Sequence, residues 1–237
     1  RRWAAAWARV RDIGTGEVAG WPLLYVESAS RATEIVCAEP DRSTWVALLR
    51  HVAGDPVAML TAASVKPQQY VAELPEGVRV DRDDESLMML DHGGGPERRI
   101  GEVDVTGFDI DPDDQGDKMT IRLVRDGRVA AEGSVGLHGA DAAYDMVETA
   151  RMFRRHGLAS WVMIELSRVA TARGVSTGLL VATAEGAGLY RSLGWTHVAP
   201  MRSVMGVGPA APRRSGQPVG NDCTSTNTSS WVGSATM

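Results

Sequence analysis

The segment Arg154-Arg155-His156-Gly157-Leu158-Ala159 stands between an alternating, strand-like pattern and a long stretch with helical periodicity. A helix that begins here exposes unpaired backbone N–H groups and the positive end of its dipole. Gly157 and Ala159 carry little side-chain bulk, so an anion can approach that backbone. The segment therefore predicts a phosphate-binding helix start, or cradle. It is neither a P-loop nor a dinucleotide fingerprint, because no Gly-Lys-Ser/Thr follows it and the three spaced glycines are missing.

The residues around this segment predict a compact α/β unit in the order βββαβαβ. Apolar and polar residues alternate over residues 118–137 on both sides of Asp126-Gly127, which is typical of a β-hairpin. Glycine at position 174 stands where a helix should end. The other expected elements are a strand near 143–149, a helix over 156–173, a strand over 177–182, a helix over 184–192 and a strand over 195–205.

About thirty residues after the cradle comes a second motif, Leu189-Tyr190-Arg191-Ser192-Leu193-Gly194-Trp195. The two motifs and their spacing resemble the GCN5-related N-acetyltransferase (GNAT) superfamily, over roughly residues 101–207. A first part without catalytic motifs, placed before a short GNAT core, is similar to the two-part actinobacterial GNAT proteins. The resemblance implies an α/β (α+β) GNAT fold, with a central, mostly antiparallel mixed sheet flanked by helices, preceded by a smaller mixed α/β GNAT-like half.

The same resemblance implies acetyl-CoA as co-substrate and no metal. The strand before the cradle would pair with the pantetheine arm, the cradle backbone would meet the pyrophosphate, and the strands holding Val147 and Val181 would separate into a V-shaped opening. A threonine stands at position 183 in place of the family's common asparagine, a change that would weaken ordering of the CoA arm. The expected cofactor-binding residues are Val147, Glu148, Thr149, Arg154, Arg155, His156, Gly157, Leu158, Ala159, Ser160, Thr183 and Tyr190.

For catalysis, Tyr190 matches the family's usual general acid, which protonates the departing CoA thiolate. Its alternative role is that of a core aromatic at a helix end. A backbone N–H near residues 147–149 would stabilise the thioester oxygen. The position at which some family members keep a glutamate base falls near an alanine here, so Asp141, Asp145 and Glu148 are candidates, and a base acting through water is equally consistent. We expect Tyr190 and Glu148 as the catalytic residues.

Composition divides the chain into three expected parts: residues 1–100 as a mixed α/β half, 101–207 as the acetyltransferase domain, and 208–237 as a disordered tail poor in large apolar residues. Within the first half, an amphipathic start carries Trp3 and Trp7. A helix is expected over 43–52, capped by Asp41 or Ser43. Carboxylates crowd together over residues 81–117, which indicates a linker and strand-edge region with solvated charges.

Charge and cysteine content exclude several classes of protein. The 237 residues include 25 Lys and Arg and 30 Asp and Glu, giving a formal net charge of -5, the wrong sign for a chain whose whole surface binds nucleic acid. Cys37 and Cys223 alone cannot build a disulfide framework or a four-cysteine zinc site, which favours a cytoplasmic location. Apolar runs such as 56–65 fall short of the ~20 residues of a membrane span.

The sequence thus predicts a cytoplasmic, acetyl-CoA-dependent N-acetyltransferase that acts on a primary amine of a small molecule or peptide by direct attack. A non-catalytic acyl-CoA-binding or interaction module with the same fold is the alternative, and a longer acyl group is a third reading. Neither nucleic acid nor membrane is an expected partner, and the sequence leaves open whether the protein forms a homodimer. The loops that choose the acceptor come from the part of the chain without motifs, so the acceptor's identity stays open.

Overall fold

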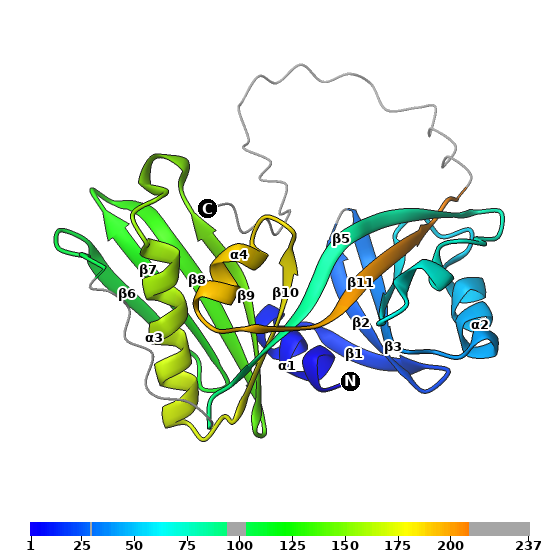
Figure 1. Cartoon of the computed structure of the whole chain (residues 1–237), viewed down its shortest axis with the longest axis horizontal. Helices are drawn as coiled ribbons and strands as arrows, with labels where there is room; N and C mark the ends of the chain where they lie inside the picture. The colour runs from blue at the N-terminus through cyan, green and yellow to red at the C-terminus, as the bar shows by residue number, and fades with distance from the viewer. Residues whose placement is uncertain (29, 94–102, 209–237) are drawn as a thin grey trace, which may run out of the picture.

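The computed structural model describes residues 1–28, 30–93 and 103–208 (Figure 1). Its helices are α1 (Arg2–Arg11), α2 (Arg42–Val52), α3 (Leu158–Ala172) and α4 (Ala187–Ser192), with short 3-10 turns η1 (Pro67–Tyr70) and η2 (Arg151–Phe153). None of the helices in these ranges combines the length and the apolar character that crossing a bilayer requires. Nearly all of the tail expected over 208–237 lies outside the described residues.

Within the described ranges, eleven strands form one continuous sheet. The strands are β1 (Gly14–Val18), β2 (Trp21–Ser28), β3 (Arg31–Ala38), β4 (Ala58–Ala63), β5 (Val78–Asp91), β6 (Asp109–Asp114), β7 (Lys118–Arg125), β8 (Arg128–His138), β9 (Asp141–Thr149), β10 (Thr177–Thr183) and β11 (Thr196–Gly206). Their spatial order is β1-β2-β3-β4-β11-β5-β10-β9-β8-β7-β6. Neighbours are antiparallel apart from the pairs β3–β4 and β9–β10. This arrangement confirms the mixed, mostly antiparallel sheet that the sequence predicts.

The two halves of the chain follow one plan and exchange their last strands. In the first half, β3, α2 and β4 are followed by β5, and in the second half β9, α3 and β10 are followed by α4 and β11. The first-half strand β5 lies between β11 and β10, and the second-half strand β11 lies between β4 and β5. Each half therefore completes its sheet with a strand from the other.

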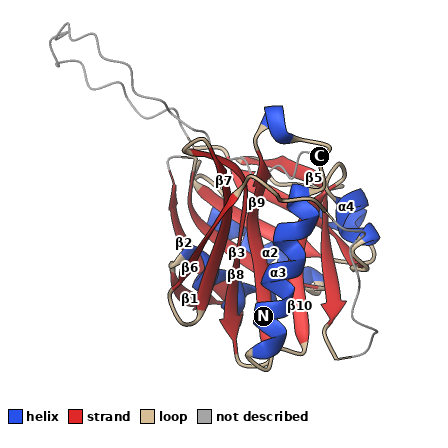
Figure 2. Ribbon diagram, turned by 90° about the vertical axis from the view of Figure 1, so that its left-hand side faces the viewer, coloured by secondary structure: helices blue, strands red, loops and turns tan. Residues whose placement is uncertain are grey.

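Helices cover both faces of this sheet. On one face, α2 packs on the first half around Ile35 and Leu60. The same face of the second half carries α3, which packs along β7, β8 and β9 and lies in front of the strands in Figure 2. The opposite face carries α1, which lies centrally between the strands of both halves in Figure 1. We call this second surface the α1 face. Trp3, Trp7 and Val10 of α1 are buried against it, so the amphipathic start predicted from the sequence joins the two halves.

The local predictions for the second half hold closely. The Asp126-Gly127 turn joins β7 and β8, and left-handed Gly174 follows α3. In the first half, α2 begins at Arg42 because the Asp41 carboxylate accepts a hydrogen bond from the Thr44 N–H at 2.7 Å, as expected of a capping aspartate. The strand-rich core, the two helices and the final strand are thus confirmed in type and order.

The prediction of a linker over residues 81–117 is wrong for residues 81–91, which form most of β5 in the middle of the sheet. Charged residues are unusual in a central strand, and so the run resembled a solvated segment. The strand tolerates them because Asp81, Arg82 and Glu85 pair with one another. The domain boundary near residue 100 stays a prediction. Strand β5 precedes this boundary in the sequence but pairs with β10 and β11, which follow it.

Gly136 of β8 offers a test of how α1 joins the halves. A Cβ atom at this position would lie 2.4 Å from the backbone N of Val10 and 2.7 Å from the backbone O of Ala6. We expect Gly136→Ala to lower the free energy of unfolding in urea by about 1–3 kcal/mol, because the backbone of α1 has to move away. Gly93→Ala is the control, since its Cβ would make only an ordinary 3.5 Å contact, and a wild-type midpoint for Gly136→Ala would contradict this packing.

A fragment of residues 101–207 tests the strand exchange. It contains the predicted acetyltransferase core but lacks β5, the strand that pairs with both β10 and β11. We expect the fragment to show no cooperative thermal transition by circular dichroism, because both strands lose their central neighbour. The intact chain is the control. A monomeric fragment with a sharp transition would show that the second half completes its sheet in another way.

Candidate active site

Strands β9 and β10 pair side by side over a short distance and then separate. Their parallel register covers three residue pairs, from Thr177–Asp141 to Leu179–Ala143. Beyond these pairs β10 continues to Thr183 and β9 to Thr149, but the two strands are no longer paired with each other. An opening between two neighbouring strands therefore begins after Leu179, as the V-shaped opening of the sequence analysis requires.

A β-bulge in β9 lies at the start of this opening. Met146 has a left-handed φ of 54°, and the register of β9 with β8 shifts between Ser134–Asp145 and Glu132–Glu148. The Ala150 N–H donates to the Ala130 carbonyl on β8, so the backbone groups of Ala150 are directed toward β8. Backbone groups alternate in direction along a strand, and those of Val147 and Thr149 are therefore directed away from β8, toward the opening. The edge of β9 can thus pair with an extended ligand that carries amide groups.

The start of α3 lies just beyond β9 and has no side-chain cap. Arg155 and Gly157 both adopt left-handed φ angles, of 68° and 77°, which turn the chain into the helix. The first helical hydrogen bond runs from Trp161 N–H to the Gly157 carbonyl, so the N–H groups of residues 158–160 have no partner within the helix. The positive end of the α3 dipole therefore remains available for an anion.

The side chains of the cradle contribute unequally. Arg154 turns back and donates to the Thr149 carbonyl at 3.2 Å, which ties the cradle to the end of β9. His156 is exposed, and its Nδ1 lies 3.2 Å from the Phe153 carbonyl, so it closes the local turn. Arg155 is exposed and forms no ion pair with any residue that the structure describes. Val103 lies beside Gly157, 3.0 Å from where a Cβ would stand, so this glycine is also needed for packing.

Tyr190 of α4 is buried in the hydrophobic core that α3 covers, as its alternative role as a core aromatic predicts. Its ring is buried and meets Trp195 edge to face, with 6.2 Å between the ring centroids. Burial raises the pKa of the Tyr190 phenol, and the negative charge of Asp145 on β9 raises it further. The phenol therefore holds its proton more tightly than an exposed tyrosine does.

The other predicted residues take these places. Glu148 lies opposite Glu132 across β8 and β9, and burial, together with the charge of Glu132, raises its pKa. The Thr183 hydroxyl accepts a hydrogen bond from the Gly186 N–H at 3.2 Å and closes the turn into α4. Leu158 is buried in the core, whereas Ala159 and Ser160 are half-buried at the start of α3.

Two of the three base candidates are held in ion pairs with α1. Arg2 binds the Asp141 carboxylate through two guanidinium nitrogens. Arg11 binds both oxygens of Asp145, at 2.5 and 3.1 Å, and Trp7 Nε1 donates to one of them at 2.6 Å. These contacts occupy both carboxylates and fix α1 next to the bulge in β9.

The equivalent place in the first half is closed. Strands β3 and β4 stay paired over six residue pairs, from Thr33–Ala58 to Ala38–Ala63, so no opening forms between them. The start of α2 is capped by Asp41, and the Glu39 carboxylate lies between the Ser64 hydroxyl and the Val65 N–H, at 2.9 and 2.6 Å. Two carboxylates at this position disfavour a phosphate, which leaves the second half as the candidate cofactor site.

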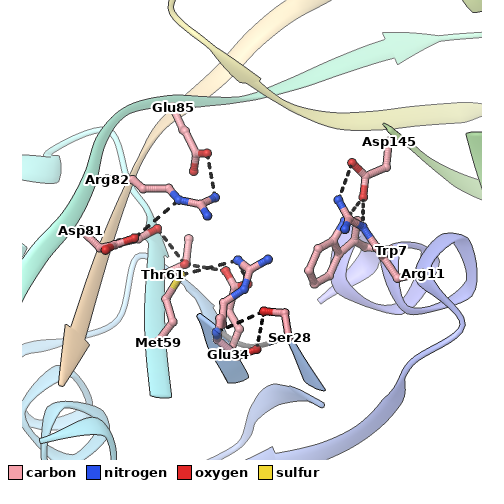
Figure 3. A network of polar contacts seen from close by, with 12 residues as sticks. Trp7, Arg11, Ser28, Glu34, Met59, Thr61, Asp81, Arg82, Glu85 and Asp145 are labelled. Atoms are coloured by element: carbon pink, nitrogen blue, oxygen red, sulfur yellow. Dashed lines mark hydrogen bonds and ion pairs between the residues drawn. The ribbon is translucent and has the colours of Figure 1, made fainter. Parts of the chain in front are cut away.

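A polar cluster on the α1 face was not predicted from the sequence (Figure 3). Glu34 is buried and accepts from Arg31 and from the Thr61 hydroxyl, both at 2.6 Å, and Thr61 lies 2.9 Å from the Ser203 hydroxyl. On β5, Arg82 donates to Glu85 at 3.1 Å. Figure 3 shows Glu85 beside Arg82, with Thr61 and Glu34 near them, and Asp145 apart from them with Trp7 and Arg11. We call Arg31, Glu34, Thr61, Arg82, Glu85 and Ser203 the central polar cluster.

The sequence indicates one carboxylate of this cluster, Glu34, but not the other, Glu85. Glu34 is a carboxylate inside an apolar strand, which is unusual and indicates a buried partner. Glu85 gives no such signal, because it stands in a run already crowded with charges. Pairing with strands far away in the sequence is what brings Glu34 and Glu85 to the same face.

No protein-family profile matches the sequence, and no curated protein is significantly similar to it. Solved structures are similar in fold. A GCN5-related N-acetyltransferase from Kribbella flavida superposes with a TM-score of 0.60 over 87% of this chain and 95% of that one, at 15% identity. A GNAT-family protein from Novosphingobium aromaticivorans gives 0.53 over 79% of this chain and 89% of that one, at 22% identity.

A tandem GNAT protein from the clavulanic acid biosynthesis pathway also superposes, with a TM-score of 0.53, covering 82% of each chain at 12% identity. These similarities extend over most of the chain and include both halves, although the sequences have diverged widely. Together with the strand order and the opening between β9 and β10, they show that the chain has the fold of the GCN5-related N-acetyltransferases, in a two-part arrangement.

Proposed function

We propose that this protein is an acetyl-CoA-dependent N-acetyltransferase whose cofactor site lies in the second half. The observation that carries the proposal is the separation of β9 and β10 beside the uncapped start of α3. One strand edge and one helix start, next to each other, match a molecule with an extended amide chain at one end and phosphates at the other.

In this proposal the backbone of residues 147–149 pairs with the amides of the pantetheine arm. The N–H groups of residues 158–160 bind the pyrophosphate, with Arg155 adding positive charge. A further observation fits the pantetheine arm: the Thr149 hydroxyl is buried and has no hydrogen-bond partner among the described residues. Because an unpaired buried hydroxyl is costly, a ligand amide beside β9 would stabilise this group.

The bound thioester supplies an activated acyl carbon for attack by a primary amine of a small molecule or peptide. Around that carbon, the backbone N–H of Val147 is the donor for the carbonyl oxygen, because the bulge at Met146 points this edge of β9 to the opening. Tyr190 gives its proton to the leaving sulfur, as burial keeps the phenol protonated until then. Hydrogen bonding from Arg154 holds the end of β9 in position.

The cradle is tested by Gly157→Val. A β-branched residue at a φ of 77° beside Val103 should displace the N–H groups of the first turn, and we expect acetyl-CoA binding measured by calorimetry to weaken about tenfold or more. Gly174→Val is the matched control, because it places the same residue at a φ of 84° at the other end of α3. Equal affinities in the two variants would remove the cradle from the proposal.

The role of Tyr190 is tested by Tyr190→Phe, which keeps the ring and removes the phenol. We expect kcat for CoA thiol release with a panel of primary amines to fall about 100-fold, while acetyl-CoA affinity stays unchanged. An unaltered kcat would remove Tyr190 from the chemistry. If the wild-type protein binds acetyl-CoA and releases no thiol with any amine, the protein is a binding module and the enzymatic proposal is wrong.

A further inference from the structure

We propose that Glu85 takes the proton from the acceptor amine, and that Glu34, Thr61 and Ser203 form the polar floor of the acceptor site. This inference rests on the proposed function and adds the base and the acceptor class to it. Its notable feature is that β5, which carries Glu85, comes from the first half of the chain, whereas the cofactor site lies in the second half.

The register of the sheet places Glu85 level with the bulge in β9. Glu85 lies directly opposite Thr183 on β10. If the one-to-one register of β9 with β10 continued beyond Leu179–Ala143, Thr183 would lie across the opening from Val147. Glu85 therefore lies on β5, the strand next to the open end of β10, and is level with Val147, whose N–H is the proposed oxyanion donor.

Glu85 also points to the α1 face, the side of the sheet opposite α3. Residues directly paired across strands share a face, and Leu87 and Met89, two and four residues along β5, belong to the core under α1. Asp145 faces the same side, as its contacts with Trp7 and Arg11 show. In Figure 3 the two side chains project from separate strands, Glu85 toward Arg82 and Asp145 toward Trp7 and Arg11.

The hydrogen bonds of the cluster single out Glu85 among its carboxylates. Both oxygens of Glu34 are occupied, one by Arg31 and one by Thr61. Glu85 has only Arg82 as a hydrogen-bond partner in the part of the chain that the structure describes, at Oε1, although its side chain is only 12% exposed. One of its oxygens is therefore free to accept a proton from a ligand.

The surroundings of Glu85 make it a stronger proton acceptor than an ordinary glutamate. Burial raises its pKa, the positive charge of Arg82 lowers it, and the negative charge of Glu34 raises it again, with a net shift above the ordinary glutamate value. Arg31 on β3 also acts on it as a cation. Thr183 and Met201, its neighbours on β10 and β11, carry no charge. A raised pKa makes a carboxylate a stronger acceptor of protons.

The rival carboxylates are less suited to this role. Asp141 and Asp145 are bound by two or more donors from α1. Glu148 lies beyond the bulge, opposite Glu132 on β8. The base predicted at Glu148 therefore becomes the competing assignment, and the experiment below separates it from Glu85.

The floor of the site indicates the class of acceptor. Glu34, Thr61 and Ser203 are buried, and the guanidinium groups of Arg31 and Arg82 lie beside them. Buried polar groups favour a ligand that continues their hydrogen bonds over an apolar one. We therefore assign the acceptor to small primary amines that carry further polar groups, rather than to amines with apolar chains.

The proton balance is complete with these groups. The acceptor ammonium loses one proton to Glu85, and its nitrogen forms the C–N bond while the C–S bond breaks. Tyr190 donates a proton to the sulfur. The nitrogen loses a second proton, which reaches Tyr190 through solvent and restores the phenol. Glu85 then releases its proton to solvent, so that one proton leaves per turnover.

The test measures CoA thiol release against pH for the wild-type protein, Glu85→Gln, Glu148→Gln and the control Asp84→Asn, a neighbouring exposed carboxylate on β5. The acceptors are ethanolamine, glycinamide and spermidine, with hexylamine as the apolar comparison. We expect Glu85→Gln to lose about 100-fold at pH 7 and to recover about tenfold per pH unit as the amine itself loses its proton. Such recovery distinguishes a proton-transfer role from a purely structural one.

Acetyl-CoA affinity by calorimetry should stay at the wild-type value in Glu85→Gln, and Glu85→Asp should retain part of the activity. A Glu85→Gln variant within twofold of wild type at every pH, or the same pH-dependent loss in Glu148→Gln instead, would overturn the assignment of Glu85 and leave the proposed function intact. Preference for hexylamine would overturn the polar floor. Binding of acetyl-CoA without thiol release from any amine would overturn both proposals.

Discussion

The hydrogen-bonded pairing of β5 with β11 is the interaction on which the rest of the structure depends. These two long strands lie at the centre of the sheet, and each separates the other from the half to which it belongs in sequence. Without them, β4 and β10 would be edge strands, and the sheet would divide into two. The exchange also explains why charged residues occupy a central strand. Arg82 and Glu85 pair on the α1 face, of which α1 covers only a part.

On this shared plan, the two halves differ at the start of one helix and in one pair of strands. In the first half, Asp41 caps α2, and β3 and β4 remain paired along their length. In the second half, Gly157 precedes an uncapped α3, and the bulge at Met146 accompanies the separation of β9 from β10. A carboxylate at a helix start competes with a phosphate, whereas a glycine leaves the N–H groups available. The proposed division of roles follows, with cofactor binding in the second half and a polar acceptor surface that draws on the first.

Sequence reasoning was most successful where structure is local. The Asp126-Gly127 hairpin, the capped α2 and the order of elements after residue 118 depend on residues close together in the chain, and the structure confirms them. It failed for residues 81–91, because a charged strand becomes recognisable only with its partners, and those partners are β10 and β11, about a hundred residues away. The contacts of Asp145 with Trp7 and Arg11 were unpredictable for the same reason.

The sequence by itself determined the resemblance to the GNAT fold, and it predicted the cradle at residues 154–159 and the role of Tyr190, because each is a short motif whose meaning lies in adjacent residues. Only the tertiary structure decided that the two halves share one sheet, that Glu34 and Glu85 lie on the same face of it, and that Asp141 and Asp145 are held by arginines of α1. The physical reason is that strand register and the face of a side chain are set by pairing between distant segments. A spacing rule along the chain carries no information on that pairing.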